Sequence, residues 1–178
     1  PPVLAAVGGF SGSGKSSFAR AVAAQLGPAP GAIVLRTDEA RKRLIGAGPV
    51  DRLDRAVYTP EFYARVYDTV LETARTCLVA GRGVVLDATF TDPVLRARAE
   101  QVAADCGVPF HGAWLTAPQA VLEARVAARV GDASDATLEV LHDQIARHGS
   151  DAVSWPKVDA TLASAEAAAG WLAGLAKV

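Results

Sequence analysis

An apolar run from Val3 to Val7 passes directly into the stretch GGFSGSGKSS, which spans Gly8 to Ser17. The spacing from Gly9 to Ser16 matches the pattern G-x-x-x-x-G-K-[ST], in which a glycine-rich loop follows a strand and opens a helix. Glycine permits the backbone turns that direct successive N–H groups at one point, and the lysine adds a positive charge there. The feature therefore predicts a phosphate-binding P-loop between a strand and a helix.

We expect this loop and the first turn of its helix to bind the phosphates of a nucleotide. The Lys15 ammonium would lie near the β and γ phosphates, and the Ser16 hydroxyl would be a ligand of Mg²⁺. A chance match in a glycine- and serine-rich turn is disfavoured, because strand and helix patterns flank the motif. The predicted phosphate-binding residues are Gly9, Ser11, Gly12, Ser13, Gly14, Lys15, Ser16 and Ser17.

Short apolar runs alternate with helical patterns along the rest of the chain. Thr59-Pro60 and Asp92-Pro93 each combine a helix-capping residue with proline at the first helical position. Strands that are buried on both faces and separated by helices are typical of parallel βαβ units. We therefore predict a three-layer α/β/α sandwich with a parallel sheet of about five strands, in one domain over residues 1–178. The predicted strands span 3–8, 32–35, 84–86, 108–115 and, more weakly, 158–162.

Composition narrows the class of protein. A chain of 178 residues that is 51% hydrophobic suits one compact domain. Its formal net charge of −1 gives no sign of a nucleic-acid or anionic-membrane partner. Cys77 and Cys106 lack metal-ligand spacing and a disulfide pattern, and no apolar stretch approaches a membrane span, so we expect a cytoplasmic protein. The chain begins Pro1-Pro2 and contains no methionine, which leaves open an excised domain.

Two acids follow predicted strands at the edge where the P-loop lies. Asp38 could accept a proton from an acceptor hydroxyl, with Arg41 one turn further on the same helical face. The alternative is that Asp38 only caps the helix. Asp87 ends an apolar strand and could serve Mg²⁺ or the acceptor, whereas an Asx turn is its structural alternative. We favour the chemical interpretation for both acids.

Arg125 and Arg129 are four residues apart and are predicted to share one helical face. They precede a polar, turn-rich segment, so we predict a short arginine lid over residues 125–136 that closes on ATP. The alternative is a solvated face with Glu123 and Asp132 as partners. Arg129 is the preferred lid residue.

Tyr58, Phe62, Tyr63 and Tyr67 recur at helical spacing. They could line an acceptor pocket, with Tyr63 as the candidate residue. For aromatic residues at this spacing we favour a role in the core. The three histidines form no ligand pattern, and we expect no role for them.

Together these motifs resemble the zeta-toxin and polynucleotide-kinase branch of P-loop kinases. The stretches VVLDATFTDPVLRARAE and WLTAPQAVLEARVAARVGDASDATLEVLHDQ are similar to the ATP-binding kinase-like domain that is fused behind an aminoglycoside-phosphotransferase-like domain in bacterial proteins. The resemblance covers nearly the whole chain. It implies that Lys15 and Ser16 serve ATP and Mg²⁺, Asp38 is the general base, Arg41 and Asp87 serve the acceptor or the metal, and Arg125 and Arg129 form the lid.

The resulting hypothesis is an ATP- and Mg²⁺-dependent kinase that acts on a hydroxyl of a small molecule, with a fused upstream domain as a further expectation. One alternative is a 5′-hydroxyl polynucleotide kinase, which the balanced charge disfavours. Others are a zeta-toxin-like nucleotide-sugar kinase and a non-catalytic ATP-binding regulatory module. Asp38 separates the last from the kinases, because a module that only binds nucleotide needs no base beside the γ phosphate.

Overall fold

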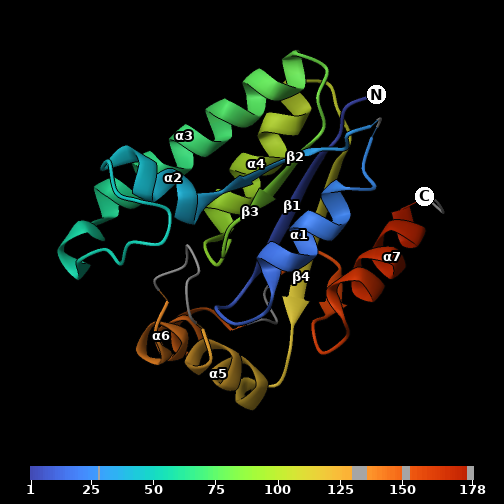
Figure 1. The fold of residues 1–178 in the computed structure, drawn as a ribbon. Coiled ribbons are helices and arrows are strands. Elements are labelled where there is room, and N and C mark those ends of the chain that lie inside the picture. The colour runs from blue at the N-terminus through green and yellow to red at the C-terminus, as the bar shows by residue number, and fades with distance from the viewer. Residues whose placement is uncertain (28, 130–135, 150–152, 176–178) are drawn as a thin grey trace.

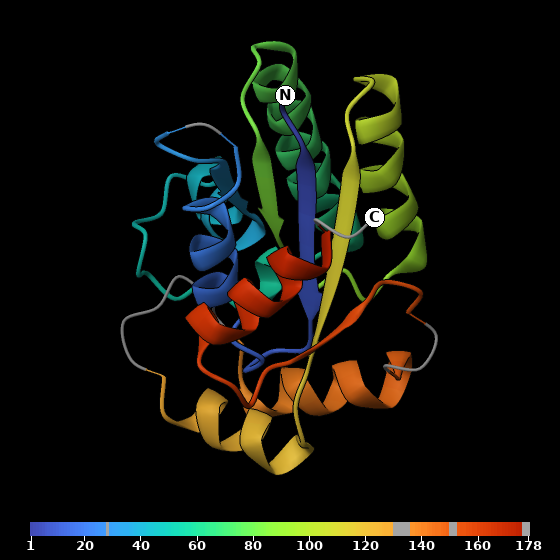
Figure 2. The same cartoon turned by 90° about the vertical axis from the view of Figure 1, so that its right-hand side faces the viewer.

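The computed structural model describes residues 1–27, 29–129, 136–149 and 153–175. Within these ranges, five strands form one all-parallel sheet in the order β2-β3-β1-β4-β5. Helices cover both of its faces, so the predicted three-layer sandwich is confirmed (Figure 1 and Figure 2). The strands are β1 (Leu4–Gly9), β2 (Ile33–Arg36), β3 (Val84–Asp87), β4 (Phe110–Thr116) and β5 (Lys157–Asp159); the helices are α1 (Lys15–Ala23), α2 (Thr37–Leu44), the 3-10 turn η1 (Arg55–Val57), α3 (Pro60–Val79), α4 (Pro93–Asp105), α5 (Gln119–Ala127), α6 (Leu138–His148) and α7 (Ser164–Leu175).

Each face of the sheet has its own apolar layer. Helices α1 and α7 cover one face, where Phe18 packs edge-on against Trp171 with ring centroids 6.0 Å apart. Helices α3 and α4 cover the other face, where Tyr67 packs against Phe90 with centroids 5.8 Å apart. Because both faces are buried, the strands carry apolar residues at nearly every position instead of alternating with polar ones.

Sheet register determines which side chains meet at the carboxyl end of the strands. Asp87 of β3 lies opposite Val7 of β1 and opposite Arg36 of β2. Paired residues point to the same face, and side chains alternate along a strand. Arg36 and Asp87 therefore share the α1 face with Val34 and Val85, whose side chains join the core beneath α1.

The helix starts predicted at Thr59 and Asp92 are confirmed, because the two side chains accept hydrogen bonds from the backbone N–H groups of Phe62 and Val94. Helix α1 ends at Ala23. The Ala23 carbonyl accepts a hydrogen bond of 2.9 Å from the N–H of Ala32, where the chain returns towards β2. None of the helices described here is long and apolar enough to cross a membrane.

Candidate functional site

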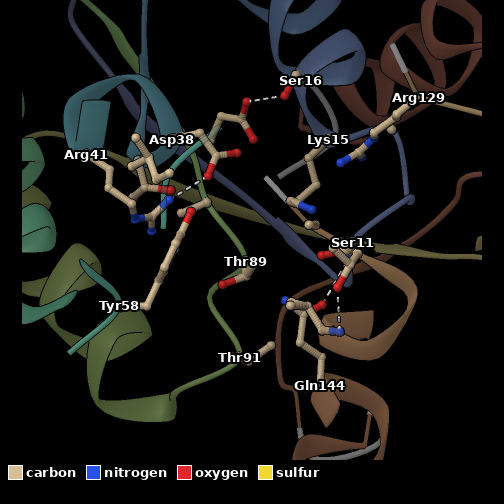
Figure 3. A pocket seen from close by; sticks show the side chains of 18 of the residues that line it. Ser11, Lys15, Ser16, Asp38, Arg41, Tyr58, Thr89, Thr91, Arg129 and Gln144 are labelled. Atoms are coloured by element: carbon tan, nitrogen blue, oxygen red, sulfur yellow. Dashed lines mark hydrogen bonds and ion pairs between the residues drawn. The ribbon is translucent and has the colours of Figure 1, made fainter. Parts of the chain in front are cut away.

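A cavity of about 760 Å³ lies at the carboxyl end of the sheet, and helices α5 and α6 lie beyond this end (Figure 1). Figure 3 shows Lys15 and Arg129 on one side and Asp38, Arg41 and Tyr58 on the other. Most of the predicted site residues meet on its walls although they come from distant parts of the sequence. These are Ser11, Gly14, Lys15, Ser16, Ser17, Asp38, Arg41, Tyr63, Asp87, Arg125 and Arg129.

The P-loop backbone turns sharply and packs closely against α5. Gly12 and Gly14 adopt left-handed conformations with φ of +83° and +81°. A Cβ atom on Gly12 would lie 2.5 Å from the carbonyl oxygen of Leu122, and one on Gly9 would lie 2.8 Å from Ser13 Oγ. Gly9, Gly12 and Ser13 are not among the residues that line the cavity, so they shape the loop from behind.

We expect Gly12→Ala to destabilise the protein and weaken nucleotide binding. A left-handed alanine costs about 1–2 kcal/mol, and the overlap with Leu122 adds about 1–3 kcal/mol. Gly46→Ala is a matched control, because Gly46 has φ +71° but no atom lies within 4 Å of an added Cβ. Thermal unfolding and nucleotide titration of both variants measure the difference. Equal losses of stability in the two variants would contradict the close packing at Gly12.

Lys15 extends into the cavity from the start of α1 and donates a hydrogen bond of 3.0 Å to the carbonyl oxygen of Phe10. Burial lowers the pKa of Lys15 from 10.5 to about 8; the Asp87 carboxylate acts in the opposite direction, and the Arg129 guanidinium lowers the pKa further. The ammonium is therefore poorly solvated and well suited to bind an anion. The P-loop end of the cavity can thus bind a polyphosphate.

Asp87 and Ser16 meet directly beside Lys15. Ser16 Oγ donates a hydrogen bond of 2.6 Å to Asp87 Oδ2. Arg36 also contacts both residues, with Nε donating to Asp87 Oδ2 at 3.0 Å and Nη2 donating to Ser16 Oγ at 2.9 Å. Burial raises the pKa of Asp87, against the opposing effects of Lys15, the Ser16 hydrogen bond and Arg36.

This pair of oxygen atoms fits the requirements of Mg²⁺. The described residues contain no group of three or more His, Cys, Asp or Glu side chains that could hold a metal ion. Mg²⁺ does not need such a group, because it usually keeps several waters and is held by one or two carboxylates together with phosphate oxygens. Ser16 and Asp87, which line the cavity beside the P-loop lysine, are the residues that could hold it.

Asp38 lies in the first turn of α2, and the structure corrects the alternative of a helix cap. Helix α2 begins at Thr37, so the cap position belongs to Arg36, and no side chain caps this end. Asp38 Oδ1 instead accepts a hydrogen bond of 2.7 Å from Arg41 Nη1. The Arg41 guanidinium in turn lies 5.1 Å from the ring centroid of Tyr58. Arg41 therefore orients the Asp38 carboxylate through its Oδ1 atom.

Arg125 and Arg129 both line the cavity, but they do not share a helical face as predicted. Helix α5 ends at Ala127, and Arg129 follows its C-cap residue. Arg125 Nη1 lies over the P-loop, 3.9 Å from the position of a Cβ on Gly14. Glu123, considered as an arginine partner, accepts from Gln119 and pairs with His142 at 2.8 Å. Residues 130–135 of the predicted lid, including Asp132, lie outside the described residues.

The aromatic residues divide between core and cavity. Tyr67 is buried, as favoured from the sequence, but it also lines the cavity. Tyr63 packs against it with the two rings tilted at 51° and their centroids 5.1 Å apart. Tyr58 is 41% exposed and lines the cavity, so the core interpretation is wrong for this residue. It precedes α3, and therefore the helical spacing does not apply to it.

Two contacts of the site involve residues that sequence reasoning missed. Gln144 of α6 lines the cavity, and its Oε1 accepts a hydrogen bond of 2.9 Å from the backbone N–H of Ser11 (Figure 3). Arg36 directly follows the predicted strand 32–35 and carries no predicted role. Both contacts depend on tertiary structure, since Gln144 is 133 residues from Ser11 and Arg36 is 51 residues from Asp87. The sequence signal for the Arg36–Asp87 contact is that strands β2 and β3 each end in a charged residue.

The chain is similar to known families and proteins. The AAA_33 family, described as AAA domain, matches residues 4–150. The protein Rv2004c of Mycobacterium tuberculosis (strain H37Rv) is 39% identical over 141 residues, which is 77% of this chain and 28% of that protein. The protein Mb2027c of Mycobacterium bovis matches to the same extent. The chain therefore spans less than a third of the length of these relatives.

Solved structures with this fold include several kinases. A gluconokinase from Sinorhizobium meliloti 1021 superposes with a TM-score of 0.68 at 23% identity, covering 99% of this chain and 93% of the other. The APS kinase CysC of Mycobacterium tuberculosis, in complex with AMPPNP and APS, gives 0.68 at 23% identity and 99% coverage of both chains. The tunicamycin resistance protein of Deinococcus radiodurans gives 0.64 at 20% identity, with 98% and 96% coverage. These likenesses establish the shared fold.

Proposed function

The chain belongs to the AAA_33 family, and from this premise we propose that it is an ATP- and Mg²⁺-dependent phosphotransferase that acts on a hydroxyl group of a small molecule. The observation that carries the proposal is that Asp38 lines the same cavity as the P-loop. Asp38 lies close enough to Lys15 to raise the pKa of that lysine, although burial is the larger effect and lowers it. A carboxylate beside the phosphate-binding loop has the chemistry of a general base.

In the proposed reaction, Asp38 accepts the proton of the acceptor hydroxyl while its oxygen attacks the γ phosphorus of ATP. The bond from that phosphorus to the β–γ bridging oxygen breaks, and ADP leaves. Lys15, Arg125 and Arg129 stabilise the negative charge of the transferring group, which is the main contribution of the protein in phosphoryl transfer. Ser16 and Asp87 would hold Mg²⁺, which when bound neutralises charge on the phosphates.

The opposite end of the cavity supports a small acceptor over a polyanion. Arg41 and Asp38 form an ion pair whose charges cancel, and the Arg41 side chain is only 9% exposed, although Arg52 also lines the cavity. Tyr58, Tyr63 and Thr89 add an aromatic and hydroxyl-bearing wall. Such a surface offers hydrogen bonds and ring contacts to a hydroxylated molecule, whereas a nucleic acid requires a continuous basic groove. We also propose a fused neighbouring domain, because this chain matches only 28% of the length of its relatives.

The proposal is tested by transfer of labelled γ phosphate from ATP to a panel of sugars, aminoglycosides, nucleosides and 5′-hydroxyl oligonucleotides. We expect transfer to a small hydroxylated compound in the presence of Mg²⁺. Transfer to oligonucleotides alone would favour the polynucleotide-kinase alternative. Nucleotide binding without transfer to any acceptor of the panel would favour the regulatory module.

We expect nucleotide affinity to depend on pH through Lys15. Its pKa is about 8 in the free protein, and bound phosphates raise it because they stabilise the ammonium. Binding therefore takes up a proton above pH 8, so affinity should be constant below that pH and fall by up to about tenfold per pH unit above it. Isothermal titration between pH 6 and 10 checks this, and Lys15→Met should remove the decline. An equal decline in both proteins would contradict the assignment to Lys15.

Arg129→Ala should lower turnover more than nucleotide affinity. The Arg129 guanidinium acts on Lys15 from across the loop and contributes mostly to the charge that develops during transfer. We expect a loss of about 10- to 100-fold in kcat with a smaller change in the ATP dissociation constant. Arg147→Ala is the control, since Arg147 is 73% exposed and pairs weakly with Asp143 at 3.7 Å. A loss confined to affinity would assign Arg129 to ground-state binding only.

A further inference from the structure

Arg36 places a buried positive charge on both residues that could hold the metal. Its side chain is 9% exposed and that of Asp87 is 4% exposed, with 3.0 Å between Arg36 Nε and Asp87 Oδ2. A second nitrogen of the same guanidinium donates to Ser16 Oγ at 2.9 Å. The third nitrogen, Nη1, contacts the exposed carboxylate of Glu39 at 3.2 Å. Arg36 is therefore built into the site and is not a solvated surface arginine.

The local charge is unfavourable for a free divalent cation. Asp87 is the carboxylate in direct contact with Ser16, and Arg36 already compensates its charge. The Lys15 ammonium lines the same cavity, whereas the Glu39 carboxylate that pairs with Arg36 is 44% exposed, so solvent screens its opposing charge. A divalent ion that approaches Ser16 Oγ and Asp87 Oδ2 therefore meets the Arg36 guanidinium, two nitrogens of which already bond to these same oxygens. Coulomb repulsion at such short distances is strong in a poorly solvated site.

We propose that Arg36 is the resident counter-cation of the Ser16–Asp87 pair and prevents the nucleotide-free protein from binding Mg²⁺ there. Metal then binds only together with nucleotide, because the negative charge of the phosphates offsets the positive charges of Arg36 and Lys15. By reciprocity, metal strengthens nucleotide binding by the same factor. This inference rests on the proposed function, since it assigns to Arg36 the control of metal loading in the same site.

The decisive variant is Arg36→Gln, which removes the charge but keeps a hydrogen-bond donor for Asp87. Mn²⁺ is the probe, followed by electron paramagnetic resonance in nucleotide-free protein. In the wild type we expect no Mn²⁺ binding that depends on Ser16, as judged by comparison with Ser16→Ala. In Arg36→Gln the Mn²⁺ affinity should rise by at least about tenfold, because removing the Arg36 charge removes its repulsion of the metal ion. Arg36→Lys keeps the charge and should behave as the wild type.

Arg82→Gln is the matched control, because it also removes one half-buried arginine charge but contacts the Gly31 carbonyl oxygen, outside the cavity. Its Mn²⁺ binding should equal that of the wild type. The coupling between Mn²⁺ and a non-hydrolysable ATP analogue should fall in Arg36→Gln by the factor gained in free-metal affinity. Weaker or unchanged Mn²⁺ binding in folded Arg36→Gln overturns the inference, because it makes Arg36 a positioning residue for the metal ligands.

The wild type tests the inference even if Arg36→Gln does not fold. Binding of Mn²⁺ to the nucleotide-free wild type that Ser16→Ala abolishes would show that Arg36 does not exclude metal, and the inference would be wrong. Failure of the wild type to bind the ATP analogue with Mn²⁺ would instead contradict the proposed function. The two failures are therefore distinguishable.

Discussion

Lys15→Met is expected to reduce phosphate transfer by at least about 10²–10³-fold, because removing one preorganised donor to a charged transition state costs this much and the lysine also neutralises the transferring group. Methionine keeps most of the side-chain length and loses the ammonium, which lies in the cavity and donates to the Phe10 carbonyl oxygen. The measurement is kcat for transfer of labelled γ phosphate at saturating ATP. Lys157→Met, on the exposed edge of β5, removes the same charge outside the cavity and should retain full activity.

The same variant should not lose stability. The pKa of Lys15 is about 8 in the folded protein and 10.5 in the unfolded chain, so the folded state binds this proton less tightly. The protonated side chain therefore lowers the free energy of unfolding at pH values below 8, and this penalty disappears as pH rises towards 10.5. Lys15→Met removes the penalty, and its melting temperature at neutral pH should equal or exceed that of the wild type. Full activity with an unchanged melting temperature would contradict the P-loop role of Lys15.

The local parts of the fold were predictable because they are encoded by neighbouring residues. Thr59 and Asp92 cap their helices through hydrogen bonds that reach only two or three residues. The P-loop pattern likewise specifies a strand, a turn and a helix within one short stretch. Its glycines at positions 12 and 14 adopt the left-handed conformations that such a turn requires.

The remaining parts of the site depend on which strands become neighbours. Arg36 meets Asp87 only because β2 lies beside β3 in register, and one sequence does not specify that order. Gln144 reaches Ser11 only because α6 lies beyond the end of the sheet (Figure 1). The error at Tyr58 has the opposite origin, since a helical period was extended over a residue that precedes the helix cap at Thr59.

Asp38→Asn is the second substitution with a large expected effect, and it separates a kinase from a module that only binds nucleotide. Asparagine is nearly the same size and can still accept the hydrogen bond from Arg41, but it cannot take up the acceptor proton. General-base catalysis contributes about 10²–10⁴-fold, so kcat with the true acceptor should fall by that factor. ATP affinity should persist, because Asp38 lies across the cavity from Lys15 and Arg129 (Figure 3). The paired measurements are nucleotide titration and labelled-phosphate transfer.

Stability provides the control for Asp38→Asn. Asp38 makes no capping hydrogen bond. The substitution therefore lowers the free energy of unfolding only through the ion pair with Arg41, in which the Asp38 side chain is 30% exposed. Because the Arg41 side chain is only 9% exposed, losing the charge of its partner costs about 1–3 kcal/mol. Asp68→Asn is the control variant, since Asp68 is 61% exposed and pairs with Arg98 at 2.6 Å outside the cavity; it should lose less stability, about 1 kcal/mol or less, and no activity. If folded Asp38→Asn transfers phosphate at the wild-type rate, Asp38 is not the base, and the observation that carries the kinase proposal is lost.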